Sequence, residues 1–154
     1  MATVKLDLLI AVRSKGIRFR AWARNSFRET LLHLKNEGFN EFQIDVSRSG
    51  LTAKTGKSQT IGLCYPVESR PGDHILVLKS GQEKEVVFNS RCLDKRGKPP
   101  DDGIEYELVP GLLADYVAEL LREGADQQEV WDATKNRRGE IIARSAIPAR
   151  VDKF

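Results

Sequence analysis

The residues of this chain most suited to contacting a ligand are three arginines spaced around a tryptophan. The segment 17–24 alternates as a strand does, which places four side chains on the same face: Arg18, Arg20, Trp22 and Arg24. Guanidinium groups can grip a phosphate through paired hydrogen bonds, and an exposed indole offers an unpaired base a stacking surface. No acidic residue occurs from Arg13 to Arg28, so the local sequence supplies no counter-charge. The pattern predicts a basic sheet face that contacts nucleic acid.

Two further basic elements could extend this face. Lys54 and Lys57 lie in a loop, residues 48–57, that contains no acidic residue, and Arg137 and Arg138 follow the last predicted helix. We expect all four to bind phosphates if the fold brings them beside the arginines of 17–24. A structural alternative stays open, in which the arginine stems cover Trp22 or the acidic helices of 111–132 dock on the basic face.

The segment Gly50–Ser58 ends in Gly-Lys-Ser, as phosphate-binding loops do. That motif has four residues between its glycines and continues into a helix. Here five residues separate Gly50 from Gly56, and the residues after Ser58 have the pattern of a strand. We therefore interpret the segment as a basic hairpin loop and expect no nucleotide cofactor.

The side chains that could hold a metal or act as a nucleophile are dispersed along the chain. Among His33, Cys64, His74 and Cys92, no two stand at the short spacing of a zinc-binding pair, so we expect no metal and two reduced thiols. Cys64 or Ser58 as a nucleophile would need His74 as its base. The carboxylates at 101–107 lack the spacing of a calcium loop. We expect a protein without catalytic activity, and a dispersed site around Cys64, His74 and those carboxylates stays open.

The charge of the chain is distributed unevenly. The net charge of the 154 residues is +3. Residues 1–98 carry +8, residues 101–132 carry −9 and residues 133–154 carry +4. No apolar stretch approaches the roughly 20 residues of a membrane-spanning helix, and no cleavable leader is recognisable. We therefore expect a cytoplasmic protein with no membrane partner.

Apolar periodicity predicts the elements that must position these residues. In the first part of the chain it predicts a hairpin of strands 4–12 and 17–23, and then a helix over 27–37 between a Ser26–Glu29 capping box and Gly38. Further strands are expected at 41–46, 60–67, 74–79, 83–89 and 104–108. The strand 74–79 is apolar on both faces, so we expect it in the centre of the sheet, under a helix.

The period changes from 2 to 3.6 after Pro110. A wide apolar stripe predicts a helix from Leu112 to Leu121, and an Asp126–Glu129 capping box predicts a shorter helix that ends near Asn136. A final strand is expected at 140–144. The segment 94–103 combines turn-forming and charged residues, which is typical of a loop or hinge.

Together these elements predict an α+β fold in a single domain, residues 1–154. We expect a mainly antiparallel sheet of about 6–8 strands, with one helix near the N-terminus and two near the C-terminus covering one face. The function that this sequence favours is non-enzymatic binding of DNA or RNA, preferably single-stranded, through the basic sheet face. The alternative is a protein-interaction or self-assembly module, in which the acidic block 101–132 meets a basic surface of a protein partner or a second copy.

Overall fold

The computed structural model describes residues 4–55, 59–94, 98–135, 137 and 140–142, and within them two sheets and three α-helices. The elements of the first half are β1 (Val4–Asp7), α1 (Leu8–Ser14), β2 (Ile17–Arg24), a short 3-10 helix η1 (Ser26–Arg28), β3 (Glu29–Asn36), β4 (Phe42–Asp45) and β5 (Gly50–Ala53). Those of the second half are β6 (Ile61–Pro66), β7 (Ile75–Leu78), β8 (Glu83–Cys92), β9 (Glu105–Leu108), α2 (Asp115–Arg122) and α3 (Gln127–Thr134).

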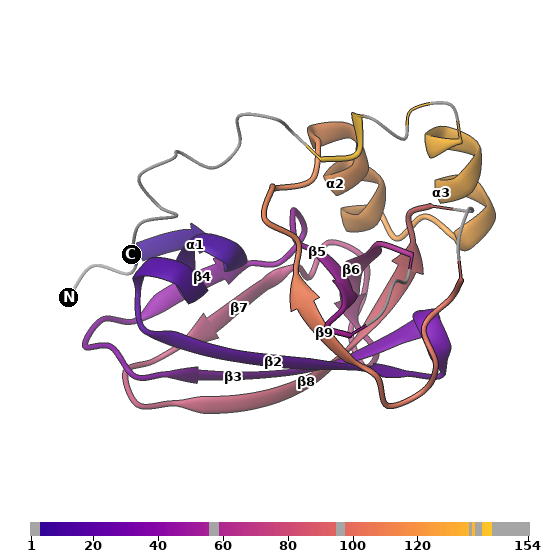
Figure 1. Ribbon diagram of the computed structural model, residues 1–154. Coiled ribbons are helices and arrows are strands. Elements are labelled where there is room, and N and C mark those ends of the chain that lie inside the picture. Colours follow the sequence, from indigo (N-terminus) through magenta and orange to yellow (C-terminus); the bar gives the residue numbers. More distant parts are fainter. Residues whose placement is uncertain (1–3, 56–58, 95–97, 136, 138–139, 143–154) are drawn as a thin grey trace.

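Six strands form a closed antiparallel barrel in the order β2-β3-β8-β6-β5-β9 (Figure 1). Strand β3 lies between the two other long strands, because it pairs with β2 from Asn36 to Glu29 and with β8 over the same residues apart from Asn36. Alternate side chains of these strands fill the barrel, among them the buried Leu32, Phe88 and Tyr106. Closure leaves the barrel strands with few free edges, and it fixes which side chains point outward.

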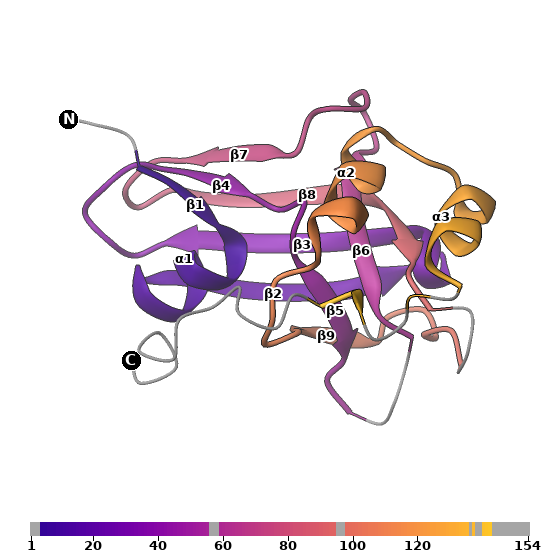
Figure 2. The same ribbon diagram turned by 90° about the horizontal axis from the view of Figure 1, so that it is seen from above.

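The other three strands form a small sheet in the order β1-β4-β7, which lies over one end of the long strands β2, β3 and β8 (Figure 2). Strands β1 and β4 are parallel, and β7 pairs with β4 in the antiparallel sense. Helix α1 follows β1 directly and buries Leu8, Leu9 and Ala11. The sheet and α1 together cover the end of the barrel from which β2 begins.

Helices α2 and α3 pack against the opposite end of the barrel, on β6 and β8 respectively. A second apolar cluster fills this contact and includes Val117, Leu121 and Val130. The predicted capping box of α3 is present, since the Asp126 side chain accepts from the Glu129 backbone N–H and the Glu129 side chain accepts from the Asp126 N–H.

The predicted fold class is confirmed: the protein is α+β, its sheets are mainly antiparallel, and one α-helix precedes and two follow most of the strands. The predicted strands around β2, β4, β6, β7, β8 and β9 are present with shifts of a few residues at their ends. Both C-terminal helices are also present. The sheet is a closed barrel with a three-stranded addition, which the sequence pattern did not indicate.

Two elements near the N-terminus were predicted wrongly. The expected helix 27–37 is η1 followed by strand β3, because residues 29–36 pair with a long strand on each side and alternate between the barrel core and its outer surface. The expected strand 4–12 stops at Asp7 and continues as α1. The hairpin partner of β2 is therefore β3 and not the segment 4–12, and β1 pairs with β4.

Two further expectations need correction or lie outside the described residues. Strand β7 is not central, because it forms an edge of the three-stranded sheet and leaves Val77 38% exposed. Within the predicted strand 140–144, Ile142 forms an isolated bridge with Leu113, and residues 143–144 lie outside the described part of the chain.

In the described residues, no helix is both long enough and apolar enough to cross a membrane.

Candidate nucleic-acid interface

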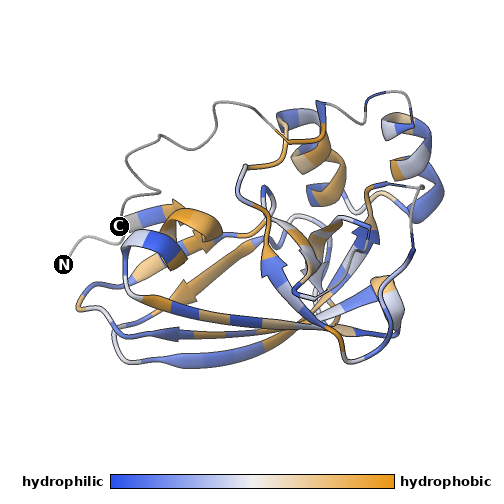
Figure 3. Cartoon of the chain, viewed as in Figure 1, coloured by the Kyte–Doolittle hydropathy of each residue, from blue (hydrophilic) through white to orange (hydrophobic). Residues whose placement is uncertain are grey.

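The outer face of β2 carries the predicted arginines. Ile17, Ala21 and Ala23 are buried toward the core, whereas Arg18, Arg20 and Arg24 are exposed on the opposite side and Trp22 is half-buried among them. Figure 3 shows the resulting alternation of hydrophilic and hydrophobic residues along this strand. The structure therefore places the four β2 residues of the predicted site, Arg18, Arg20, Trp22 and Arg24, on one barrel face.

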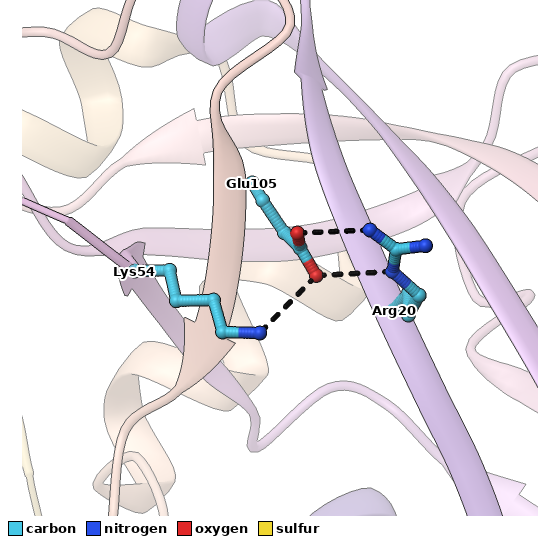
Figure 4. A network of polar contacts seen from close by, with 3 residues as sticks. All are labelled: Arg20, Lys54 and Glu105. Carbon is cyan, nitrogen blue, oxygen red and sulfur yellow. Dashed lines mark hydrogen bonds and ion pairs between the residues drawn. The ribbon is translucent and has the colours of Figure 1, made fainter.

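Arg20 is held by an acidic residue from a distant part of the chain. Its Nε and Nη2 atoms donate to the two carboxylate oxygens of Glu105 on β9, at 3.1 and 3.0 Å. Lys54 Nζ lies 3.5 Å from the same carboxylate (Figure 4). The hydrogen bond from Arg20 lowers the pKa of Glu105 below its ordinary value, and the same contact raises the pKa of Arg20. Arg20 and Lys54 are thus brought together, with Glu105 as a shared counter-ion.

Arg20 also covers part of Trp22. The guanidinium carbon lies 4.7 Å from the centroid of the indole ring, which is the geometry of a cation–π contact. Across the strands, Trp22 is the direct neighbour of Glu105 on β9 and of Leu31 on β3. Arg20 therefore covers part of Trp22, as the structural alternative expected of an arginine on this face. The acidic residue beside it comes from strand β9 and not from one of the acidic helices.

A hollow of about 470 Å³ opens beside the first half of β2. Its polar lining comes from three strands and holds three cations, one histidine and one carboxylate: Arg18, Arg20, Lys35, His33 and Glu83. His33 Nε2 lies 2.5 Å from the Glu83 carboxylate, and Arg18 reaches Glu37 at 3.7 Å. Phe19, Ile17 and Val12 supply its apolar wall. We call this the basic hollow.

The opening exists because β9 pairs with β2 only at Ala21 and Trp22. Among the described residues, Ile17–Arg20 therefore have a strand neighbour on one side only. A smaller hollow of about 170 Å³ lies between α1 and β9, and it shares Val12 and Phe19 with the basic hollow. Its charged lining adds Arg13 and Lys54 on the basic side and Glu105 and Glu107 on the acidic side.

The other predicted basic residues are not gathered here. Arg137 pairs with Glu140 at 2.8 Å and lies over the ring of Tyr116 at 4.1 Å. Tyr116 belongs to α2, which packs on β6, so Arg137 is not brought to the hollow beside β2. Lys57 and Arg138 lie outside the described residues.

Sequence reasoning missed Arg13, His33 and Lys35 as members of this surface. His33 and Lys35 alternate with Leu32 and Leu34, which are buried in the barrel. That alternation indicates a strand with His33 and Lys35 on its outer face, but the same residues were predicted as a helix. Arg13 follows the apolar run that was interpreted as strand and is α1 instead.

Some of the groups that the sequence left open for catalysis are buried or hydrogen-bonded. Both cysteines are free and buried, and burial raises the pKa of Cys64 and Cys92 to about 11, so both thiols are protonated near neutral pH. Of the carboxylates at 101–107, Asp102 accepts from the Ser26 backbone N–H and Glu105 from Arg20. Among the residues that the structure describes, no three His, Cys, Asp or Glu side chains converge as metal ligands would.

We compared the chain with models of known protein families, with curated proteins and with solved structures. None of the three comparisons gives a match.

Proposed function

We propose that this protein binds single-stranded nucleic acid across the first half of β2. The observation that carries the proposal is the basic hollow, whose lining holds three cations, Arg18, Arg20 and Lys35, and one carboxylate, Glu83. Glu37 and Glu105, which pair with Arg18 and Arg20, lie outside this lining. Such a cluster of cations attracts the phosphates of a nucleic acid whatever its base sequence, and each phosphate that is neutralised releases counterions. The hollow is the natural place for one or two phosphates of a strand.

Trp22 and Arg20 supply the part of the site that a base would occupy. They form a stacked pair on the outer face of the barrel, next to the basic hollow. Arginine planes and aromatic rings both stack on unpaired bases, and bases inside a duplex do not offer their faces. This arrangement favours a single strand over a duplex.

The experiment is a fluorescence-polarisation titration with a labelled single-stranded oligonucleotide, repeated over a range of salt. We expect affinity to fall steeply with salt. Trp22→Ala should weaken binding by about tenfold, within the range of roughly 1–3 kcal/mol for one stacked base. Leu31→Ala is the matched control, because it removes an apolar neighbour of Trp22 on the same outer face and no stacking surface.

A second control addresses charge. Lys35→Ala should weaken binding and reduce its salt dependence, whereas Arg70→Ala should leave both unchanged, since Arg70 is exposed in the 67–73 turn and lines neither hollow. Binding that is absent at low salt, or equal losses for Lys35→Ala and Arg70→Ala, would reject the proposal.

An acidic protein partner is the second candidate. It is favoured by the Glu105 contact, in which a carboxylate of the acidic segment 101–132 already binds Arg20 and Lys54 within one chain. A partner that presents an acidic strand could bind the remaining cations in the same way. Light scattering after size-exclusion chromatography of the chain mixed with polyglutamate, at low and high salt and without nucleic acid, tests this candidate: a salt-sensitive complex of chain and polyglutamate supports it.

A further inference from the structure

A third hollow, of about 460 Å³, lies on the outer surface of the barrel, on the side where β6 ends. Pro66, Val67 and Val87 form its apolar floor, and Val67 is 41% exposed. The pairing of β6 with β8 shifts register between Leu63 and Pro66, an irregularity of the kind that locally disrupts a strand ladder. We call this the acidic hollow, because its charged lining holds three carboxylates and one cation: Glu29, Glu68, Glu85 and Arg24.

These carboxylates are available to a partner. Within the described part of the chain, none of Glu29, Glu68 and Glu85 forms an ion pair, in contrast to Glu105 and Glu83. Glu68 and Glu85 are also exposed to solvent. An apolar floor rimmed by unpaired carboxylates is suited to a surface that carries cations around an apolar centre.

The basic and acidic hollows lie on one continuous face formed by β2, β3 and β8. The strand register places Lys35 opposite Arg18 and Glu83, at the basic end, and Glu29 opposite Arg24 and Asn89, at the other end. Between the two ends lies an outward-facing row of three cross-strand neighbours, of which the last also lines the acidic hollow: Trp22, Leu31 and Val87. All three are half-buried, so the row offers some apolar surface to a partner.

We propose that this face binds a second copy of the chain. The two hollows have nearly equal volumes and opposite charge balance, three cations to one carboxylate and three carboxylates to one cation. A two-fold axis passing between them places the basic hollow of each copy on the acidic hollow of the other, so the same favourable contact forms twice. The Trp22–Leu31–Val87 row then lies near the axis. Because the face is rich in charge, the dimer is weak and sensitive to salt.

The test is a charge-exchange experiment with two double variants. In the first, Arg18→Glu and Lys35→Glu reverse the basic hollow; in the second, Glu68→Lys and Glu85→Lys reverse the acidic hollow. Each variant alone then presents two hollows of the same sign, and we expect its self-association at low salt to be at least tenfold weaker than that of the native chain. Mixed in equal amounts, the two variants present complementary hollows at both contacts. We expect the mixture to form a heterodimer about as stable as the native dimer.

Sedimentation-velocity ultracentrifugation of each sample, at low and at high salt, gives the readout. Recovery in the mixture shows that both variants are folded. A native chain that stays monomeric at low salt and high concentration overturns the proposal. So does a mixture that fails to associate when circular dichroism shows both variants folded, and so does a Glu68→Lys, Glu85→Lys variant that still dimerises. A variant that still dimerises would place the contact on another surface, and a native chain that stays monomeric is what a small basic peptide as occupant of the acidic hollow would give.

The inference does not rest on the proposed binding of nucleic acid, and the same variants separate the two. The Glu68→Lys, Glu85→Lys variant keeps the basic hollow, so it should lose self-association and retain oligonucleotide binding. If the native chain binds no oligonucleotide but the mixture of variants forms the heterodimer, the proposal of nucleic-acid binding is rejected and the proposal of a dimer stands.

Discussion

The carboxylate of Glu105 on β9 accepts two hydrogen bonds from the guanidinium of Arg20 on β2, a residue 85 positions earlier in the chain. The same carboxylate lies 3.5 Å from Lys54 on the loop end of β5. Paired contacts between a guanidinium and an oxyanion are how arginine also binds phosphate. Glu105 therefore occupies the position that a phosphate would take at Arg20, and it competes with one.

Glu105→Gln should strengthen the binding of a single-stranded oligonucleotide. The substitution removes the negative charge that holds Arg20 and Lys54, while the amide keeps nearly the same shape. We expect affinity at low salt to rise by about threefold to tenfold, the scale of one nearby charge at a solvated surface. Fluorescence polarisation measures it. Thermal stability should change little, because exposed ion pairs contribute little to folding.

Glu107→Gln is the matched control for that substitution. Glu107 lies on the same strand, is exposed and forms no ion pair among the described residues. Its loss changes the net charge equally without releasing Arg20. Equal gains for both variants would mean that net charge alone matters, and a loss of affinity for Glu105→Gln would contradict the competition.

The position of Glu105 shows what the sequence could and could not predict about the site. Alternation along 17–24 correctly placed three arginines and Trp22 on one face, since a strand's period is a local property. The counter-ion could not be predicted, because only closure of the barrel brings β9 beside β2. The local sequence supplies the arginines with no counter-charge, and in the folded chain Glu105 supplies one to Arg20 from a distant strand.

The fold shows the same division between local and long-range information. The helix α3 begins at a capping box that four consecutive residues encode, and it was predicted within about two residues. Strand β3 was predicted as a helix because Phe27, Leu31 and Leu34 recur at helical spacing. Its pairing with two long strands, β2 and β8, overrides that pattern, as tertiary context commonly does with weak local preferences.

Gly62→Ala should destabilise the contact between the barrel and α2. A Cβ at position 62 would lie 2.6 Å from Leu121 Cδ1, closer than side chains pack, and 3.2 Å from Leu93 Cδ2. Overpacking of this kind costs about 1–3 kcal/mol. Urea denaturation followed by circular dichroism measures the loss. In the Leu121→Ala background the same glycine substitution should cost less, because the clashing methyl group is gone. Additive losses would show that the two residues do not meet.

Alkaline pH should weaken folding through Cys64. The thiol is fully buried, and burial raises its pKa from 9.0 to about 11. The unfolded chain loses this proton near pH 9 while the folded chain keeps it, so the unfolded state gains stability as pH rises. The contribution of Cys64 is complete below pH 9, decreases between pH 9 and 11, and amounts to about 2–3 kcal/mol for a rise of this size. Urea denaturation under reducing conditions at pH 8 and at pH 11 measures the difference.

Cys64→Ala isolates that thiol from the other groups that titrate in the same range. Cys92 and Tyr106 are also buried with raised pKa values, and both remain in the variant. The variant starts less stable at pH 8, because a small cavity replaces the sulfur. Its further loss between pH 8 and pH 11 should nevertheless be smaller than that of the native chain by about 2 kcal/mol. Parallel losses in the two proteins would mean that Cys64 ionises as readily in the folded state as in the unfolded one, which burial of the thiol does not allow.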